Sequence, residues 1–279
     1  MKLATLRRPE NPTETYAAVV SGNETAELTG FADVGAFLAA PATTRDEAAA
    51  SATPSGDLAG VSFATLITHP SKVFCIGLNY RNHILETGNE LPEYPTVFTK
   101  FADSLTGAND DIEIPAEEHR VDWEGELAIV IGPGGRRISE ADAPAAIAGY
   151  AVSNDISMRG WQSRTSEWTQ GKCWEASTPV GPYLVTPDEF DDGATITTKV
   201  NGEVVQQDST GDLVFGTAAL ISYLSTIVTL RPGDLVLTGT PAGVALGRRN
   251  EQGRHPWLKA GDVVETEIAG LGAQRNRFV

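Results

Sequence analysis

Short apolar runs separated by turn residues dominate the chain from about residue 71 onward. Such runs, bounded by Gly, Pro, Asn or Asp, are typical of buried β-strands. We therefore predict strands at 72–76, 127–131, 235–238 and 262–268. The main part of the chain is expected to be rich in β-structure.

A β-hairpin is the clearest local signal. Residues 194–200 and 203–206 flank Asn201-Gly202. These two residue types tolerate the positive φ angles of a type I′ turn, whose twist matches that of the flanking strands. The spacing therefore predicts two antiparallel strands joined at Asn201 and Gly202.

Helical patterns are fewer. Ser139 and Asp142 have the spacing of a capping box ahead of a helix at 143–148, and apolar residues recur at helical spacing from 214 to 224. Isolated helices among strands, without regular β-α-β alternation, indicate a mixed α+β fold that is β-rich. Composition changes near residue 65, which predicts a small N-terminal domain and linker over 1–65 and a main domain over 66–279.

Composition excludes several classes of protein. The 279 residues include 21 Lys and Arg against 37 Asp and Glu, a formal charge of −16, which disfavours a nucleic-acid binder. The opening MKLATLRRPENP lacks the apolar core of a signal peptide, and no run approaches the roughly 20 apolar residues of a membrane span. Cys75 and Cys173 are too few for a disulfide framework and are expected to be buried thiols. We expect a cytoplasmic protein.

Common catalytic motifs are absent from the sequence. Neither a P-loop nor a Gly-x-Ser-x-Gly elbow occurs. The four histidines, at 69, 83, 119 and 255, never fall at the spacing of a two-histidine zinc helix. Nucleotide binding, serine hydrolase chemistry and a His-rich metal site are therefore disfavoured.

Acidic residues cluster around the predicted strand 127–131. Glu124 and Glu126 lie two apart, so their side chains project from one face of a strand, and Asp155 follows the next apolar segment. One interpretation is a solvent-facing strand edge. The other is a divalent-cation site, because a metal ion relieves the repulsion between close carboxylates, and oxygen ligands favour Mg²⁺ or Mn²⁺. Gly125 would then let metal or substrate approach the backbone.

Two further groups of polar residues are candidates for chemistry. His83 and Glu86 lie three apart and would share one face of a helix, where Glu86 could make His83 a better proton acceptor. Arg159, Gln162 and Lys172 could donate hydrogen bonds to carboxylate or enolate oxygens. Ordinary solvated surface side chains are the alternative for both groups.

Read together, these segments resemble the fumarylacetoacetate hydrolase family from about Ser71 to the C-terminus. The resemblance rests on Ile76-Gly-Leu-Asn-Tyr80 with His83 and Glu86, Phe98-Thr-Lys100, Glu124-Gly-Glu126-Leu, Asn154-Asp155 with Arg159 and Gln162, Gly171-Lys172, Pro179-Val-Gly-Pro182, and Leu237-Thr-Gly-Thr-Pro-Ala-Gly-Val244. Two segments depart from the family pattern: 173–177, and Trp161 with 163–169. Both departures concern substrate choice more than the metal.

The resemblance implies a β-roll-like catalytic domain that is often dimeric, so a homodimer is expected. It implies Mg²⁺ or Mn²⁺ held by Glu124, Glu126 and Asp155, and a 2-oxo or 2,4-dioxo acid as the small-molecule partner. It also implies that His83 and Glu86 lie on a segment that closes over substrate. The residues expected at the substrate are Tyr80, Lys100, Arg159, Gln162, Lys172 and Thr240.

The leading hypothesis is hydrolysis of the carbon–carbon bond of an acylpyruvate. His83, oriented by Glu86, would activate water, and Lys172 with Gln162 would stabilise the developing negative charge. Fumarylpyruvate, from aromatic-compound degradation, is the favoured substrate, with Arg81, Arg159 and Arg164 as candidates for its second carboxylate. The alternatives are oxaloacetate decarboxylation, 2-hydroxyhepta-2,4-diene-1,7-dioate isomerisation, and a binding protein without catalysis. No nucleic-acid or membrane partner is expected.

Overall fold

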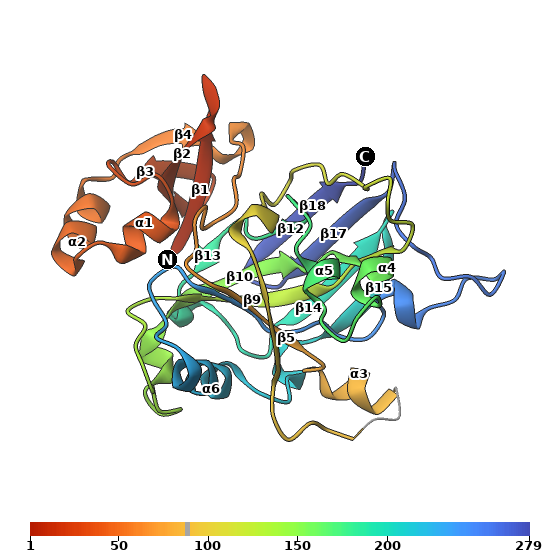
Figure 1. Cartoon of the computed structure of the whole chain (residues 1–279). Helices are drawn as coiled ribbons and strands as arrows, with labels where there is room; N and C mark the ends of the chain where they lie inside the picture. The colour runs from red at the N-terminus through yellow and green to blue at the C-terminus, as the bar shows by residue number, and fades with distance from the viewer. Residues whose placement is uncertain (87–89) are drawn as a thin grey trace.

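A ten-stranded mixed sheet organises the chain (Figure 1). The computed structural model describes residues 1–86 and 90–279, and the side chains of Ser55, His83 and Glu86 lie outside the described part. In spatial order the strands are β4 (Pro54–Asp57), β3 (Glu24–Glu27), β2 (Asn11–Ser21), β1 (Lys2–Arg8), β13 (Leu184–Val185), β10 (Ile147–Asn154), β9 (Gly125–Ile131), β16 (Leu235–Leu237), β5 (Val73–Gly77) and β6 (Thr96–Lys100).

A second, four-stranded antiparallel sheet packs beside the first. Its order is β15 (Glu203–Ser209), β14 (Thr195–Val200), β17 (Val263–Ile268) and β18 (Gly272–Arg277). Asn201 and Gly202 have φ angles of 51° and 84°, which confirms the predicted hairpin turn. Two short pairs, β7 (Leu105–Thr106) with β12 (Thr178–Pro179) and β8 (Val121–Asp122) with β11 (Ser157–Met158), complete the strands. The four predicted strands are all present.

The helices are few and short. They are α1 (Val34–Ala39), α2 (Ala42–Ser51), α3 (Arg81–Glu86), α4 (Arg159–Gln162), α5 (Thr169–Lys172) and α6 (Thr217–Ile227). The helix predicted near 214–224 is therefore confirmed as α6, but the one predicted at 143–148 is wrong. A single 3₁₀ turn covers Ala143–Ala146, and Ile147 already pairs with Ile131 as the first residue of β10. Sheet pairing outweighs the capping signal at Ser139.

Strand β9 is buried on both faces of the large sheet. Leu127 and Ile129 belong to a core cluster that also contains Leu220 of α6 and Ile196 of the small sheet. Ala128 and Val130 point to the opposite cluster, together with Leu3, Phe37 and other N-terminal residues. Because apolar side chains cover both faces, the strand that carries Glu126 and directly follows Glu124 is held firmly in place.

The N-terminal strands continue the large sheet. Strand β1 pairs antiparallel with β2 on one side and with β13 on the other, where Leu3 lies opposite Leu184. Figure 1 shows β1 to β4, α1 and α2 gathered at one side of the molecule. The proposed domain boundary at residue 65 stays a prediction, since this edge of the sheet joins the two parts.

The two cysteines are free thiols in different surroundings. Cys75 is buried in β5, as expected, whereas Cys173 is only half-buried, which corrects the expectation for that residue. No helix within residues 1–86 and 90–279 combines the length and hydropathy that a membrane crossing requires.

Candidate metal centre and catalytic cavity

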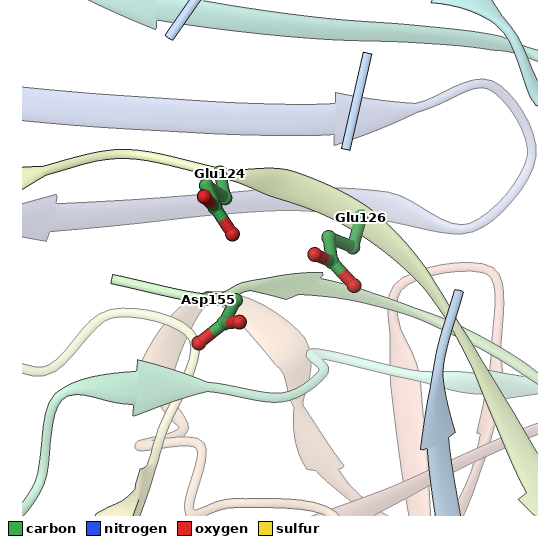
Figure 2. Close-up of side chains that lie close together, drawn as sticks. All are labelled: Glu124, Glu126 and Asp155. Atoms are coloured by element: carbon green, nitrogen blue, oxygen red, sulfur yellow. The ribbon is translucent and has the colours of Figure 1, made fainter. Parts of the chain in front are cut away.

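The three acidic residues meet where β9 and β10 lie side by side. Glu124 precedes β9, Glu126 is its second residue, and Asp155 directly follows β10. Gly125 pairs with Asn154, and the amide of Asp155 donates to the carbonyl of Glu124 at 2.8 Å. One ligand oxygen from each carboxyl group lies within 4.8 Å of the others, and Figure 2 shows the three side chains together. The predicted acidic triad is therefore assembled.

Three cations surround the triad. Lys172 Nζ lies 2.5 Å from Glu124 Oε2 and 2.8 Å from Asp155 Oδ2. Lys100 Nζ lies 2.6 Å from Asp155 Oδ1. Arg159 Nη2 lies 2.6 Å from Glu124 Oε1. All of these side chains are buried or nearly so, which excludes the solvent-facing strand edge as the explanation of the acidic cluster.

The pairing shifts the pKa values of the charged groups. Burial disfavours the ammonium form of Lys172, but the carboxylates of Asp155 and Glu124 outweigh it and raise the pKa of Lys172. Burial likewise opposes ionisation of Asp155, but Lys100 and Lys172 outweigh it and lower the pKa of Asp155. Lys172 is therefore a cationic hydrogen-bond donor at neutral pH rather than a proton acceptor.

Glu126 differs from the other two acids. Its Oε2 accepts a hydrogen bond from the amide of Gly239 at 2.8 Å, but no Lys or Arg in the described ranges forms an ion pair with it. Burial, followed by the nearby carboxylates of Asp155 and Glu124, raises the pKa of Glu126 well above its ordinary value. The arrangement leaves one carboxyl group without a cation.

The lack of a cation partner for Glu126 is consistent with a divalent metal ion bound by the triad. Three buried carboxyl groups with closely spaced oxygens offer the ligands that hard cations prefer, and no His or Cys belongs to the cluster. Glu124, Glu126 and Asp155 would hold the ion. The observed charges therefore support a divalent-metal site.

Asp122 positions the side chain of Arg159 beside the triad, a role that the sequence did not reveal. Its carboxylate accepts hydrogen bonds from the amides of Ala245 at 2.6 Å and Leu246 at 3.1 Å, and from Arg159 Nε at 2.8 Å. Arg159 also donates to Gln162 Oε1 at 2.9 Å. Asp122 thus orients the guanidinium that contacts Glu124.

Gly125 faces away from the triad, which corrects its predicted role. A Cβ atom on Gly125 would lie 2.3 Å from Thr198 Oγ1 in the small sheet. Its amide donates to Gln206 Oε1 at 3.0 Å, and its carbonyl accepts from Thr240 Oγ1 at 2.9 Å. Glycine is required here because the two sheets approach closely, not because metal or substrate does.

A cavity of about 580 Å³ opens beside the triad. Glu124, Glu126 and Lys172 form part of its wall. The apolar wall consists of Ile76, Leu78, Phe98, Trp168, Val244 and Leu246. Its volume falls in the range of small-molecule binding sites. The cavity therefore combines a charged reaction centre with an apolar wall.

Most predicted substrate residues reach this cavity, but two do not. Arg159, Gln162, Lys172 and Thr240 line it. Tyr80 is fully buried and absent from the wall, and its hydroxyl has no hydrogen-bond partner in the described part of the chain. Lys100 is buried behind Asp155. In this structure Tyr80 packs in the core and Lys100 neutralises Asp155, so a contact of either residue with substrate stays a prediction.

His83 and Glu86 lie in α3 (Arg81–Glu86), so the helix that their proposed pairing requires is present. The segment before α3 is anchored by Asn79, whose Nδ2 donates to the carbonyl of Thr238 at 2.8 Å. The side chains of His83 and Glu86 lie outside the described residues. Their role as an oriented proton acceptor stays a prediction.

The arginines proposed for a second carboxylate do not gather at the cavity. Arg159 is occupied by acids, and Arg164 stacks 3.4 Å above the ring of Trp161. Neither Arg81 nor Arg164 lines the cavity, whereas Arg120 does. Nothing in the local sequence around Arg120 distinguished it from other surface arginines.

Comparison with known families agrees with this site. A family model described as fumarylacetoacetate (FAA) hydrolase C-terminal matches residues 72–279. The chain therefore belongs to the fumarylacetoacetate hydrolase family, and it is an enzyme of that family.

Two curated relatives extend the comparison. The chain is 46% identical over 223 residues to "Oxaloacetate tautomerase fahd2, mitochondrial" of Xenopus laevis, covering 78% of this chain and 69% of that protein. It is 43% identical over 223 residues to the human "Oxaloacetate tautomerase FAHD2A, mitochondrial", covering 78% and 70%.

Solved structures share the whole fold. A putative HpcE protein from Mycobacterium smegmatis is 35% identical with a TM-score of 0.87, covering 100% of this chain and 99% of that chain. The 2-hydroxyhepta-2,4-diene-1,7-dioate isomerase of Mycobacterium marinum is 31% identical with a TM-score of 0.78, covering 100% and 98%. The maleylpyruvate hydrolase of Sphingobium sp. SYK-6 is 26% identical with a TM-score of 0.81, covering 100% and 99%. The β-rich α+β fold is thus that of the family.

Proposed function

We propose that this protein is a Mg²⁺- or Mn²⁺-dependent enzyme that interconverts the keto and enol forms of a short 2-oxo diacid, with oxaloacetate as the leading substrate. The observation that carries this proposal is the buried triad of Glu124, Glu126 and Asp155, two of whose members, Glu124 and Glu126, line a cavity that also contains hydrogen-bond donors. The 46% identity to a tautomerase of Xenopus laevis favours oxaloacetate over the fumarylpyruvate of our sequence-based hypothesis.

Enolisation removes a proton from C3 and places a proton on the C2 oxygen, and ketonisation reverses both transfers. The bound metal would supply Lewis-acid stabilisation of negative charge on the 2-oxo acid. Lys172, held as an ammonium by Glu124 and Asp155, would donate a hydrogen bond to the developing enolate oxygen. Gln162 and Thr240 would orient the carboxylate, and His83 is proposed to carry the proton.

Carbon–carbon bond hydrolysis of an acylpyruvate is the second candidate. The apolar wall formed by Phe98, Trp168 and Leu246, among others, suits an acyl chain longer than that of oxaloacetate. The shared fold with a maleylpyruvate hydrolase also favours this activity. The same stabilised enolate would then be the leaving group.

One set of assays separates the candidates. The chelator-stripped protein, with Mg²⁺ or Mn²⁺ added back, is mixed with enol-oxaloacetate, and the loss of enol absorbance is followed. Malate dehydrogenase reports the keto product, and lactate dehydrogenase reports pyruvate.

Metal-dependent acceleration of enol loss without pyruvate would support tautomerisation. Pyruvate from oxaloacetate would indicate decarboxylation, and pyruvate with a matching acid from acetylpyruvate or fumarylpyruvate would indicate hydrolysis. No acceleration of any of these reactions would contradict the proposal.

A further inference from the structure

Arg120 is a cavity-lining cation without an acidic partner. Three basic side chains lie on the wall: Arg120, Arg159 and Lys172. Arg159 pairs with Asp122 and Glu124, and Lys172 pairs with Glu124 and Asp155. Within the described ranges, the guanidinium of Arg120 forms no ion pair and no hydrogen bond, so its charge is available to a ligand.

The backbone of Arg120 is nevertheless fixed. Its amide donates to Glu118 Oε1 at 2.7 Å, and its carbonyl accepts from the amide of Arg159 at 2.9 Å. Glu118 is only 3% exposed, and its Oε2 accepts from the amide of Trp161 at 3.2 Å. A Cβ atom on Gly160 would lie 2.5 Å from that oxygen, so the packing is tight. Arg120 is therefore anchored to the same short helix, α4, that carries Arg159 and Gln162 to the cavity.

The surroundings of Arg120 favour an anionic ligand. The other two basic side chains on the wall, Arg159 and Lys172, are already paired with carboxylates, so Arg120 is the cation left for a second negative charge on a ligand. A guanidinium presents paired N–H donors that match the two oxygens of a carboxylate. Arg164, one of the three arginines that the sequence suggested for a second carboxylate, does not line the cavity and stacks on Trp161.

We propose that Arg120 binds the distal carboxylate of a dicarboxylic 2-oxo acid whose 2-oxo acid end lies at the triad, and that it makes the enzyme selective for diacids. The inference rests on the proposed function for the position of the 2-oxo acid end. It assigns to Arg120 the recognition that the sequence suggested for Arg81, Arg159 and Arg164. Arg120 acts in specificity and takes no part in proton transfer.

The test uses a matched pair of ligands with equal carbon number. Binding of 2-oxoglutarate, a diacid, and 2-oxovalerate, a monoacid, is measured by titration calorimetry on the full-length Mg²⁺-loaded protein. Arg120→Ala is expected to weaken 2-oxoglutarate binding about ten- to a hundredfold, as for loss of a charged hydrogen bond, with 2-oxovalerate changed less than about twofold. Arg120→Lys should lie between. The KM for oxaloacetate should rise in parallel while kcat changes little.

Arg164→Ala is the control, since it removes the same charge nearby but outside the cavity. Equal weakening of both ligands by Arg120→Ala, no weakening of the diacid, or an equal effect of Arg164→Ala would overturn the inference. A diacid preference that Arg120→Ala erases, in a protein that does not accelerate oxaloacetate enol loss, would uphold the inference and reject the proposed activity. A wild-type protein that accelerates oxaloacetate enol loss but binds 2-oxoglutarate no more tightly than 2-oxovalerate would uphold the proposed activity and overturn the inference.

Discussion

Two arginine–glutamate pairs show how burial changes the value of one contact. Arg8 of β1 pairs with Glu27 of β3 at 2.6 Å, and Arg159 pairs with Glu124 at the same distance. The side chains of the first pair are 32% and 30% exposed, whereas those of the second are 8% and 11% exposed. Solvent therefore screens the first pair much more than the second.

This difference in exposure distinguishes an ordinary surface ion pair from an ion pair in the candidate reaction centre. Exposed pairs contribute little because solvent screens them, while breaking a buried pair leaves an uncompensated charge. Around the triad, Asp122, Glu124 and Asp155 share three cations, and Glu126 has no ion pair in the described part of the chain. The N-terminal strands have no comparable imbalance at Arg8 and Glu27. A metal ion binds most favourably where buried carboxylates outnumber the cations that pair with them.

The largest expected effect comes from Glu126→Gln. It removes the carboxylate that lacks a cation, so affinity for Mg²⁺ and Mn²⁺ and metal-dependent turnover should both fall by more than about a hundredfold. The free energy of unfolding of the metal-free protein should stay equal or rise, because a buried ionisable group is lost. Calorimetric metal titration and urea unfolding measure the two quantities. Glu27→Gln is the matched control, and unchanged metal affinity in Glu126→Gln would contradict the site.

Asp122→Ala should destabilise the protein most. It deprives buried Arg159 Nε and the amides of Ala245 and Leu246 of their acceptor, which is expected to lower the free energy of unfolding by about 3–5 kcal/mol. Urea unfolding checks this. Asp122→Asn keeps the shape and should cost less. If Asp122→Ala lowers the free energy of unfolding no more than removal of the exposed Arg8–Glu27 pair does, burial does not explain the difference between the two sites.

Gly125→Ala should have an intermediate effect. The new methyl group meets Thr198 Oγ1 at 2.3 Å, and such overpacking typically costs about 1–3 kcal/mol. Gly60→Ala is the control, because no heavy atom lies within 4 Å of its added Cβ. Thermal unfolding of both variants, and of Gly125→Ala combined with Thr198→Ala, tests whether the contact is responsible. Without partial recovery in the combined variant, the sheet-to-sheet contact is not the cause.

The smallest effect is expected at Arg8. Arg8→Ala removes the exposed pair with Glu27 and the stacking 4.5 Å from the Tyr16 ring, so the loss of stability should be about 1 kcal/mol and turnover should not change. A double-mutant cycle with Glu27→Ala measures the pair alone, and its coupling energy should shrink as salt is added. A coupling energy above that of a buried pair would refute the comparison.

Sequence patterns predicted the elements whose information is local. The Asn201-Gly202 turn, the buried strand β9 and the two-residue spacing of Glu124 and Glu126 all depend on neighbours in the chain. The helix expected after Ser139 failed because Ile147 has a partner strand that the local pattern does not reveal. Local signals decide an element only where no distant partner competes.

For the candidate site, too, the sequence predicted the features that depend on local spacing and missed those that depend on distant partners. The triad could be found, but the pairing of Lys100 with Asp155 joins residues 55 positions apart, and that of Arg159 with Asp122 joins residues 37 apart. Arg120 and Arg164 look alike in sequence, and only the packing of α4 places one on the cavity wall and the other on Trp161. Which charges are already paired is a property of the folded chain.

The place of β16 in the sheet has a consequence for biosynthesis. This strand lies between β9 and β5, antiparallel to one and parallel to the other, although it comes more than a hundred residues later in the chain than both. Until the ribosome has released residues 235–239, β9 and β5 have no strand to join them, and the Glu126 carboxylate has no Gly239 amide. The reaction centre is thus completed only when most of the polypeptide has been translated, whatever the earlier segments do on their own.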